Sequence, residues 1–347
     1  MTIKNNLRQS NFELLRIVSM FAILLSHILI HGFAGIENFS QSNNYIWHQF
    51  INSFLMIHVN LFLLISGFFG IKFKWESLYK LLSKCFFYSV SIYVIWHLYN
   101  GTSITIHDFL GRASFIYKKN PWWFVYVYLQ LFMISPILNI VIRVINKSQY
   151  IKILCLLLFL NCIIGGLLRS DINPNGFTLQ HFILMYFIGG YIRKFDLFIK
   201  VKSKKLVVGY LCSSLLVFLL ALLPIHLWIG YVNPFVILGS VIVFVVFKRF
   251  SFQSRIINWF SASAFSVYLL HDEDTVVRGL MSFIGNYIYL YTDVFILYFP
   301  FLIIVAIAIF LSAVIVDKCS DYFLAPFSFL GKSKFVKIIL NKISVNE

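Results

Sequence analysis

The sequence predicts an all-α integral membrane protein, a bundle of about ten transmembrane helices with both termini cytoplasmic. Of its 347 residues, 60% are hydrophobic and only 12% are charged, whereas a soluble domain carries roughly 25% charged residues. The mean hydropathy is +0.84. A soluble protein of this size has no interior large enough to hide so much apolar surface, so a lipid bilayer is expected to surround it.

Long apolar runs are the second observation, and they set the order of the helices. A spanning helix needs about 20 mostly apolar residues, whereas a strand of a membrane barrel shows only about ten residues of alternating character. The runs have the length of helices, although the sixth and the ninth are short. We expect spans at residues 12–33, 50–70, 85–100, 122–142, 151–168, 178–192, 206–224, 233–250, 256–271 and 293–316. The whole chain, 1–347, is expected to form one membrane domain without an appended soluble domain.

The third observation is where the positive charges lie. The predicted outer loops hold only five basic residues, Arg112, Lys118, Lys119, Arg169 and Arg278, so 24 of the 29 Lys and Arg residues lie in predicted cytoplasmic segments. This asymmetry is what the positive-inside rule requires. The net charge of +16 therefore reflects topology, and no nucleic-acid partner is expected. The tail is cytoplasmic from residue 317, and its end, "KSKFVKIILNKISVNE", is expected to form a basic helix on the inner membrane surface.

The first span carries an arginine and a histidine at a spacing that places both on one face of a helix. Arg16 and His27 are eleven positions apart, which at about 100° per residue is three turns plus about 20°, so both side chains project from one face. The helical rise separates them by about 16 Å. Glu13 lies three residues before Arg16 and is placed to pair with it.

Two interpretations of these residues follow. Arg16 by itself is explained by snorkelling towards lipid headgroups, and His27 by a hydrogen bond to a neighbouring helix. However, ionisable residues inside a span usually face the bundle interior or a wet cavity, and the unperturbed pKa of an imidazole suits a general base. His31 completes a His-x-x-x-His pair, but two ligands make a poor metal site. No metal and no bound cofactor are expected, and the five scattered cysteines indicate no disulfide framework.

Other polar and aromatic residues mark the opposite side of the membrane. His271 ends the ninth span, with Asp272 beside it and Arg278 further on, which predicts a carboxylate-oriented histidine near the entrance for an acceptor or, alternatively, an interfacial helix end. Asn60 lies within the second span, where interhelical packing is its simplest role. Trp123 belongs to an aromatic belt or to a platform for a sugar ring.

Four segments, in order along the chain, resemble motifs of the acyltransferase-3 family of membrane acyltransferases. "NFELLRIVSMFAILLSHILIHG" is similar to the family's first helix, which has an Arg, ten residues and a His, here Arg16 and His27. "VNLFLLISGFFG" resembles a run that ends in Ser-Gly-Phe, here Ser66, Gly67 and Phe68. "PWWFVYVYLQLFMISPILN" and "FSVYLLHDEDTVVR" are similar to two later motifs. The last one resembles most the branch from surface-polysaccharide gene clusters of Gram-positive bacteria.

The chain also departs from the family pattern. The family often has Arg-x-x-Arg at the start of the third span, where "YKLLSK" supplies Lys80 and Lys84. Lysine keeps the charge but lacks the bidentate fork of arginine. Phe132 stands where a tyrosine is expected, and the acidic cluster Asp272–Asp274 is unusually dense.

The resemblance implies transfer of an acyl group from a coenzyme A thioester, usually acetyl-CoA, to a sugar hydroxyl of a cell-surface polysaccharide or its lipid-linked precursor. Acyl-CoA is then a co-substrate, held at a basic inner mouth by Arg16, Lys80 and Lys84 through charge-assisted hydrogen bonds. His27 acts as general base or carries the acyl group, and Glu13, Asn60 and Ser66 are supporting polar residues. The protein is expected in the bacterial cytoplasmic membrane.

Two other functions remain open from the sequence. A transporter or flippase of lipid-linked sugars, or a polysaccharide polymerase, would also need a membrane bundle with internal polar residues. No pair of Gly/Pro-broken segments recurs in the two halves of the chain, which weakens the interpretation as an inverted-repeat transporter. Direct transfer to the acceptor is favoured because no fused extracellular domain is predicted.

Overall fold

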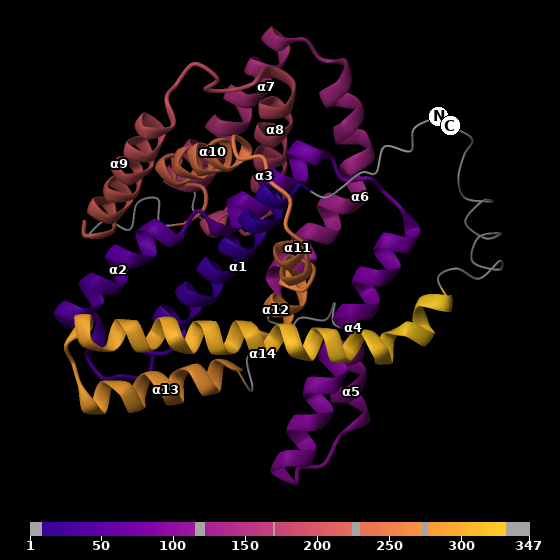
Figure 1. Ribbon diagram of the computed structural model, residues 1–347, viewed down its shortest axis with the longest axis vertical. Coiled ribbons are helices and arrows are strands. Elements are labelled where there is room, and N and C mark those ends of the chain that lie inside the picture. The colour runs from indigo at the N-terminus through magenta and orange to yellow at the C-terminus, as the bar shows by residue number, and fades with distance from the viewer. Residues whose placement is uncertain (1–8, 115–121, 169–170, 224–229, 273–276, 331–347) are drawn as a thin grey trace.

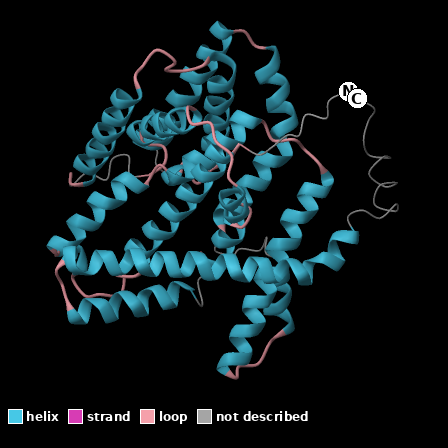
Figure 2. Cartoon of the chain, in the orientation of Figure 1, coloured by secondary structure: helices cyan, strands magenta, loops and turns pink. Residues whose placement is uncertain are grey.

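The computed structural model describes residues 9–114, 122–168, 171–223, 230–272 and 277–330. This part of the chain is helical and contains no strand (Figure 2). The first half comprises α1 (Ser10–His31), the 3-10 turn η1 (Phe39–Gln41), α2 (Asn43–Leu55), α3 (His58–Phe69), α4 (Trp75–Asn100), α5 (Ile106–Ala113), α6 (Trp123–Val144) and α7 (Lys147–Leu158), which continues as the π-helix η2 (Phe159–Leu168). The second half comprises η3 (Pro174–Gly176), α8 (Leu179–Phe195), α9 (Ser203–Ala221), α10 (Pro234–Lys248), α11 (Arg255–Ser261), α12 (Ala264–His271), α13 (Val277–Tyr291) and α14 (Phe295–Leu330) (Figure 1).

Seven helical segments of the described chain are long and apolar enough to cross a membrane. They are residues 10–31, 43–69, 75–100, 123–144, 147–168, 203–221 and 295–323, and α10 is a shorter apolar helix. The predicted class, a helical membrane protein with several spans, agrees with this finding. The predicted number of about ten spans is higher than the number of segments that meet the length criterion.

The predicted helix bounds differ from the structure where hydropathy is a poor guide. The segment 43–69 is broken after α2, so the second span consists of two helices. Residues 255–271 likewise form α11 and α12 rather than one ninth helix. The third helix begins at Trp75, well before the predicted residue 85, because charged residues do not stop a helix although they lower its hydropathy. Two amphipathic helices, α5 and α13, lie in segments predicted as loops.

Local signals in the sequence explain where several helices begin. Asn146 and Gln149 form a reciprocal capping box at the start of α7. Asn233 caps α10 through its side chain, and Pro234 takes the first helical position, where its missing N–H is not needed. Thr105 caps α5 by accepting from the Asp108 backbone N–H.

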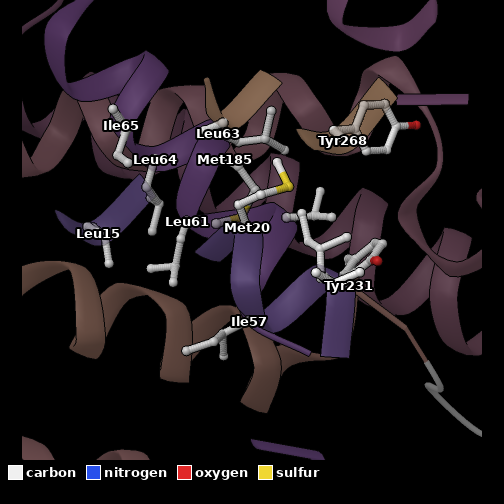
Figure 3. Packing of buried hydrophobic residues seen from close by; sticks show 14 of the residues in the cluster. Leu15, Met20, Ile57, Leu61, Leu63, Leu64, Ile65, Met185, Tyr231 and Tyr268 are labelled. Atoms are coloured by element: carbon white, nitrogen blue, oxygen red, sulfur yellow. The ribbon is translucent and has the colours of Figure 1, made fainter. Parts of the chain in front are cut away.

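The core of the bundle forms where α1 and α8 pack against α3. Leu61, Leu63 and Leu64 of α3 meet Leu15 of α1 and Met185 of α8 in one buried cluster (Figure 3). Helix α1 lies centrally, in contact with α2, α3, α10, α11, α12, α13 and α14 (Figure 1). Because so many helices surround α1, its polar side chains are held inside the bundle.

Small residues allow the backbones of α3 and α8 to touch. A Cβ atom added to Gly67 would lie 2.1 Å from the Tyr186 carbonyl oxygen, and one added to Gly189 would lie 2.5 Å from the Leu64 carbonyl oxygen. Close approach at glycine is a common way to join helices inside a membrane. Neither contact can be relieved by turning a side chain, because the obstructing atoms belong to the backbone.

We expect Gly67→Ala to destabilise the protein by about 1–3 kcal/mol, since the added methyl group must push two backbones apart. The thermal unfolding midpoint of the purified protein in detergent measures the effect. Gly279→Ala is the matched control, because nothing lies within 4 Å of an added Cβ atom there. Equal midpoints for the two variants would contradict this account of the α3–α8 contact.

Candidate active site

A cavity of about 420 Å³ lies inside the bundle and brings many of the predicted site residues together. It lies between α1, α3, α4, α6, α11 and α12, and Tyr231 from the loop before α10 closes one side. Its lining residues are Arg16, Met20, Ile23, His27, Val59, Phe62, Ile65, Ser66, Lys80, Leu81, Lys84, Trp123, Phe124, Tyr128, Tyr231, Ser261, Ala262, Ala264, Phe265 and Tyr268. The predicted donor cations, the predicted base and Trp123 therefore share one space.

Helix α1 provides the long wall of this cavity. Arg16, Met20, Ile23 and His27 all line it, at spacings of four, three and four residues, which form one helical stripe. The cavity thus runs along α1 for about 16 Å from the Arg16 end to the His27 end. This arrangement is the shared face that the spacing of the two residues predicts.

Arg16 is tied to α11 through Glu13. Its Nη1 atom lies 2.7 Å from Glu13 Oε1, as the three-residue spacing predicts. Glu13 is buried, and its second oxygen accepts a hydrogen bond from the Ser261 hydroxyl. The Arg16 side chain is about one-third exposed and lines the cavity, so a cation that Glu13 holds in place borders this space.

At the other end, His27 faces a buried carboxylate. Its Nδ1 atom lies 3.4 Å from Oδ1 of Asp272, and the same Oδ1 accepts a hydrogen bond of 2.7 Å from Arg278 Nη2. The Asp272 side chain is 1% exposed and that of His27 is 17% exposed. The imidazole therefore lines the cavity while Asp272 lies behind it.

The expected pairing of Asp272 with His271 is wrong. His271 Nδ1 lies 2.7 Å from the Val267 carbonyl oxygen, one helical turn back, and its ring centroid is 5.2 Å from that of His27. Successive residues of a helix point in directions about 100° apart, so Asp272 and His271 do not share a face. The carboxylate reaches across to the histidine of another helix instead, and His271 lies beside the cavity without lining it.

Trp123 lines the cavity as part of an aromatic group. Its ring is stacked with that of Tyr231 at a centroid distance of 6.1 Å and lies 4.2 Å from that of Phe177. The indole is thus held by neighbouring rings rather than left free in a loop.

The supporting polar residues have separate positions. Ser66 lines the cavity, and its hydroxyl donates to the Phe62 carbonyl oxygen at 2.9 Å. Asn60 is fully buried outside the cavity, where it donates to the Tyr231 carbonyl oxygen at 3.1 Å and lies 2.8 Å from His181 Nε2. Asn60 of α3 is therefore joined by these contacts to His181 of α8 and to the loop that carries Tyr231.

Sequence reasoning missed several residues of the site. Tyr268 lines the cavity one turn before His271, a spacing that "FSVYLLHD" displays. Asp317 pairs with Lys84 at 2.6 Å, although the topology prediction places residue 317 in the cytoplasmic tail. Two other predictions, the acidic residues Glu273 and Asp274 and the basic tail 332–347, lie outside the described residues.

These features define a multi-pass helical membrane protein whose internal cavity joins cations to an imidazole beside a carboxylate. The chain belongs to the acyltransferase-3 family, since the family's model, an acyltransferase domain, matches residues 9–317. The protein is therefore a membrane acyltransferase, which favours this class over the transporter and the polymerase. No curated protein and no solved structure matches the chain.

We expect Arg278→Gln to destabilise the fold by about 3–5 kcal/mol, because it strips a buried carboxylate of its cation. The measurement is thermal unfolding in detergent. Arg278→Gln/Asp272→Asn should recover most of the loss, since it removes both charges. Lys248→Gln is the matched control, because its partner Asp196 is 57% exposed and surface pairs contribute about 0–1 kcal/mol. A double variant as unstable as Arg278→Gln would contradict the pairing.

Proposed function

We propose that the protein is an O-acyltransferase that moves an acetyl or similar acyl group from acyl-CoA to a sugar hydroxyl of a cell-surface polysaccharide or its lipid-linked precursor. The observation that carries the proposal is the single cavity that has cations at the Arg16 end and the His27–Asp272 pair at the other. A polyanionic donor and a base are both needed for this reaction, and the cavity provides for each.

The donor enters from the Arg16 end in this proposal. Arg16, Lys80 and Lys84 line that end, and its excess of positive charge attracts the phosphates of acyl-CoA through charge-assisted hydrogen bonds. Which of the three residues binds them depends on their ionic partners. Acyl-CoA is cytosolic and cannot cross a bilayer unaided, so the Arg16 end is the cytoplasmic one. The largely apolar wall along α1, with Met20 and Ile23, then accommodates the uncharged arm of the donor and leads its thioester to His27.

His27 is the general base of the proposed reaction. Because Nδ1 faces Asp272, a proton held on Nδ1 leaves Nε2 to accept the proton of the sugar hydroxyl. The hydroxyl oxygen attacks the thioester carbonyl, the tetrahedral intermediate collapses, and the CoA thiolate leaves and takes the proton from Nε2. Asp272 orients the ring and stabilises the transient imidazolium. No covalent acyl-enzyme is required, and no proton is gained or lost overall.

The acceptor reaches His27 from the opposite side. Trp123 and Tyr231 present stacked rings in the cavity, a surface that suits the apolar face of a sugar. His271 and Arg278 lie around the His27–Asp272 pair and border this approach. With both termini cytoplasmic and ten spans in the bacterial cytoplasmic membrane, the proposed acceptor side faces outward, where a surface polysaccharide is assembled.

We expect His27→Ala to reduce acyl transfer by about 10²–10⁴-fold, the contribution of a positioned base. Nuclear magnetic resonance of polysaccharide from wild-type, deletion and His27→Ala strains identifies the acyl group and its position and gives its amount. His107→Ala, which changes a histidine that is 83% exposed, is the control. Normal acylation in a His27→Ala strain with normal protein levels would refute the proposed mechanism.

We expect Asp272→Asn to lower kcat on the order of 10²-fold while KM for acyl-CoA changes little, because the amide cannot stabilise the imidazolium. Steady-state kinetics on purified protein with acetyl-CoA and a soluble sugar acceptor test this split. The thermal midpoint of the same variant shows whether the fold persists. A folded variant with an unchanged kcat would remove Asp272 from the mechanism.

A further inference from the structure

The three cations that line the Arg16 end of the cavity differ in their ionic partners. Arg16 is paired with Glu13, and Lys84 is paired with Asp317. Lys80 is exposed and has no ionic partner within the described part of the chain. All three residues line the same cavity, but Lys80 offers a ligand a full positive charge, whereas the charges of Arg16 and Lys84 are balanced by their partners. The Arg16 end of the cavity is called the rim below.

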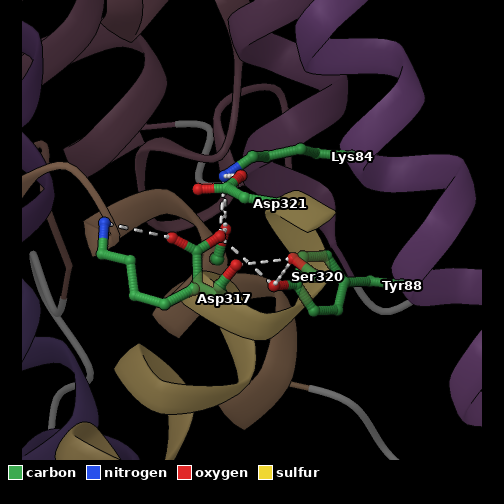
Figure 4. Close-up of polar contacts among 7 residues, drawn as sticks. Lys84, Tyr88, Asp317, Ser320 and Asp321 are labelled. Carbon is green, nitrogen blue, oxygen red and sulfur yellow. Dashed lines mark hydrogen bonds and ion pairs between the residues drawn. The ribbon is translucent and has the colours of Figure 1, made fainter. Parts of the chain in front are cut away.

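Asp317 is buried in α14 and gathers several donors around it. Its Oδ1 atom accepts hydrogen bonds from Lys84 Nζ at 2.6 Å, from the Ser266 hydroxyl at 2.5 Å and from the Tyr88 hydroxyl at 3.3 Å. The side chain is 1% exposed, and Figure 4 shows it on α14, close to Lys84 and Tyr88 of α4. An ionisable residue at such a depth in an apolar segment is unusual and points to a function.

Breaking the contact between Lys84 and Asp317 would cost a large free energy. The Lys84 ammonium donates to Ser266 at 3.2 Å as well as to Asp317, and its departure would strand a buried carboxylate. Lys318 Nζ is 4.0 Å from the other oxygen and is too distant to replace it. Asp321 is also 3.7 Å from Lys84 but is 54% exposed, so water screens its effect. Lys84 thus lines the cavity wall with its charge neutralised by Asp317, which lies behind it.

We propose that Asp317 is a positioning residue that fixes Lys84 in the cavity wall and cancels its charge, so that Lys80 is the cation that binds the anionic groups of the donor. The inference rests on the proposed function, because a polyanionic CoA donor is what makes the rim charge matter. It assigns to Asp317 an electrostatic role in donor binding in addition to its contacts between helices.

Single and double variants of Lys84 and Asp317 separate the electrostatic role of Asp317 from a purely structural one, because they change the charge of the pair in opposite directions and then restore it. Asp317→Asn removes the negative charge and keeps the shape, so the rim gains one positive charge and CoA should bind more tightly, by about fivefold at low salt. Lys84→Met leaves Asp317 uncompensated, and CoA should bind about fivefold more weakly. Lys84→Met/Asp317→Asn is neutral again and should bind CoA like the wild type.

The experiment is isothermal titration calorimetry of purified full-length protein in detergent with CoA as the probe, at low and at high salt. Lys80→Met should weaken binding by about tenfold at low salt, and the differences among all variants should shrink at high salt. Lys248→Met/Asp196→Asn is the matched control, because this ion pair lies outside the residues that line the cavity. It should leave CoA affinity unchanged.

The outcomes distinguish the two proposals. If the folded wild-type protein binds no CoA, the proposed function fails and this inference fails with it. If the wild type binds CoA but the neutral double variant binds as weakly as Lys84→Met, then Lys84 itself grips the donor and the inference alone is wrong. An Asp317→Asn protein that is folded and binds more weakly than the wild type would overturn it equally. If Asp317→Asn does not fold, the double variant and Lys80→Met test the inference. The double variant should bind CoA like the wild type, and Lys80→Met should bind it more weakly.

Discussion

The architecture depends on one constraint, that a charge inside an apolar bundle must have a partner. Glu13, Asp272 and Asp317 are each almost fully buried, and each contacts a cation within 2.7 Å. All three carboxylates also join different helices, since Glu13 of α1 reaches α11, Asp272 reaches α1 and α13, and Asp317 of α14 reaches α4 and α12. The need to pair buried charges thus fixes where the helices meet, and the cavity lies between these meeting points.

The same pairs divide the cavity into two chemical environments. Cations border the Arg16 end, whereas the His27 end has an imidazole backed by a carboxylate and covered by aromatic rings. Attraction of anions and proton transfer require different surroundings, because an unpaired cation close to an imidazole disfavours its protonation. Arg278, a cation at the His27 end, is paired with Asp272. A separation of about 16 Å along α1 keeps the two environments apart within one continuous space.

The sequence predicts those parts of the site that depend on contacts within a single helix. Arg16 and His27 share a face of α1 because helical periodicity is local, and the pairing of Glu13 with Arg16 follows for the same reason. Asp272 and Asp317 find their partners on other helices, His27 and Lys84, and nothing in one sequence shows which distant helices touch. The breaks between α2 and α3 and between α11 and α12 were missed likewise, because Met56 and Ile57 at the first and Ala262 and Ser263 at the second include no proline or glycine that would signal a break.

The glycine contact between α3 and α8 also limits how the bundle can deform. The carbonyl oxygen of Tyr186 lies directly against Gly67, so α3 and α8 cannot slide or rotate against each other without a backbone collision. The part of the cavity wall that α3 provides is therefore rigid. Helix α4 is different, because only 22% of the residues in its most apolar stretch are buried in the bundle. This helix carries Lys80 and Lys84 on the side that lines the cavity. Of the long helices that line the cavity, α4 is therefore the least enclosed by the rest of the bundle, and the ion pair with the Asp317 carboxylate of α14 holds it in place.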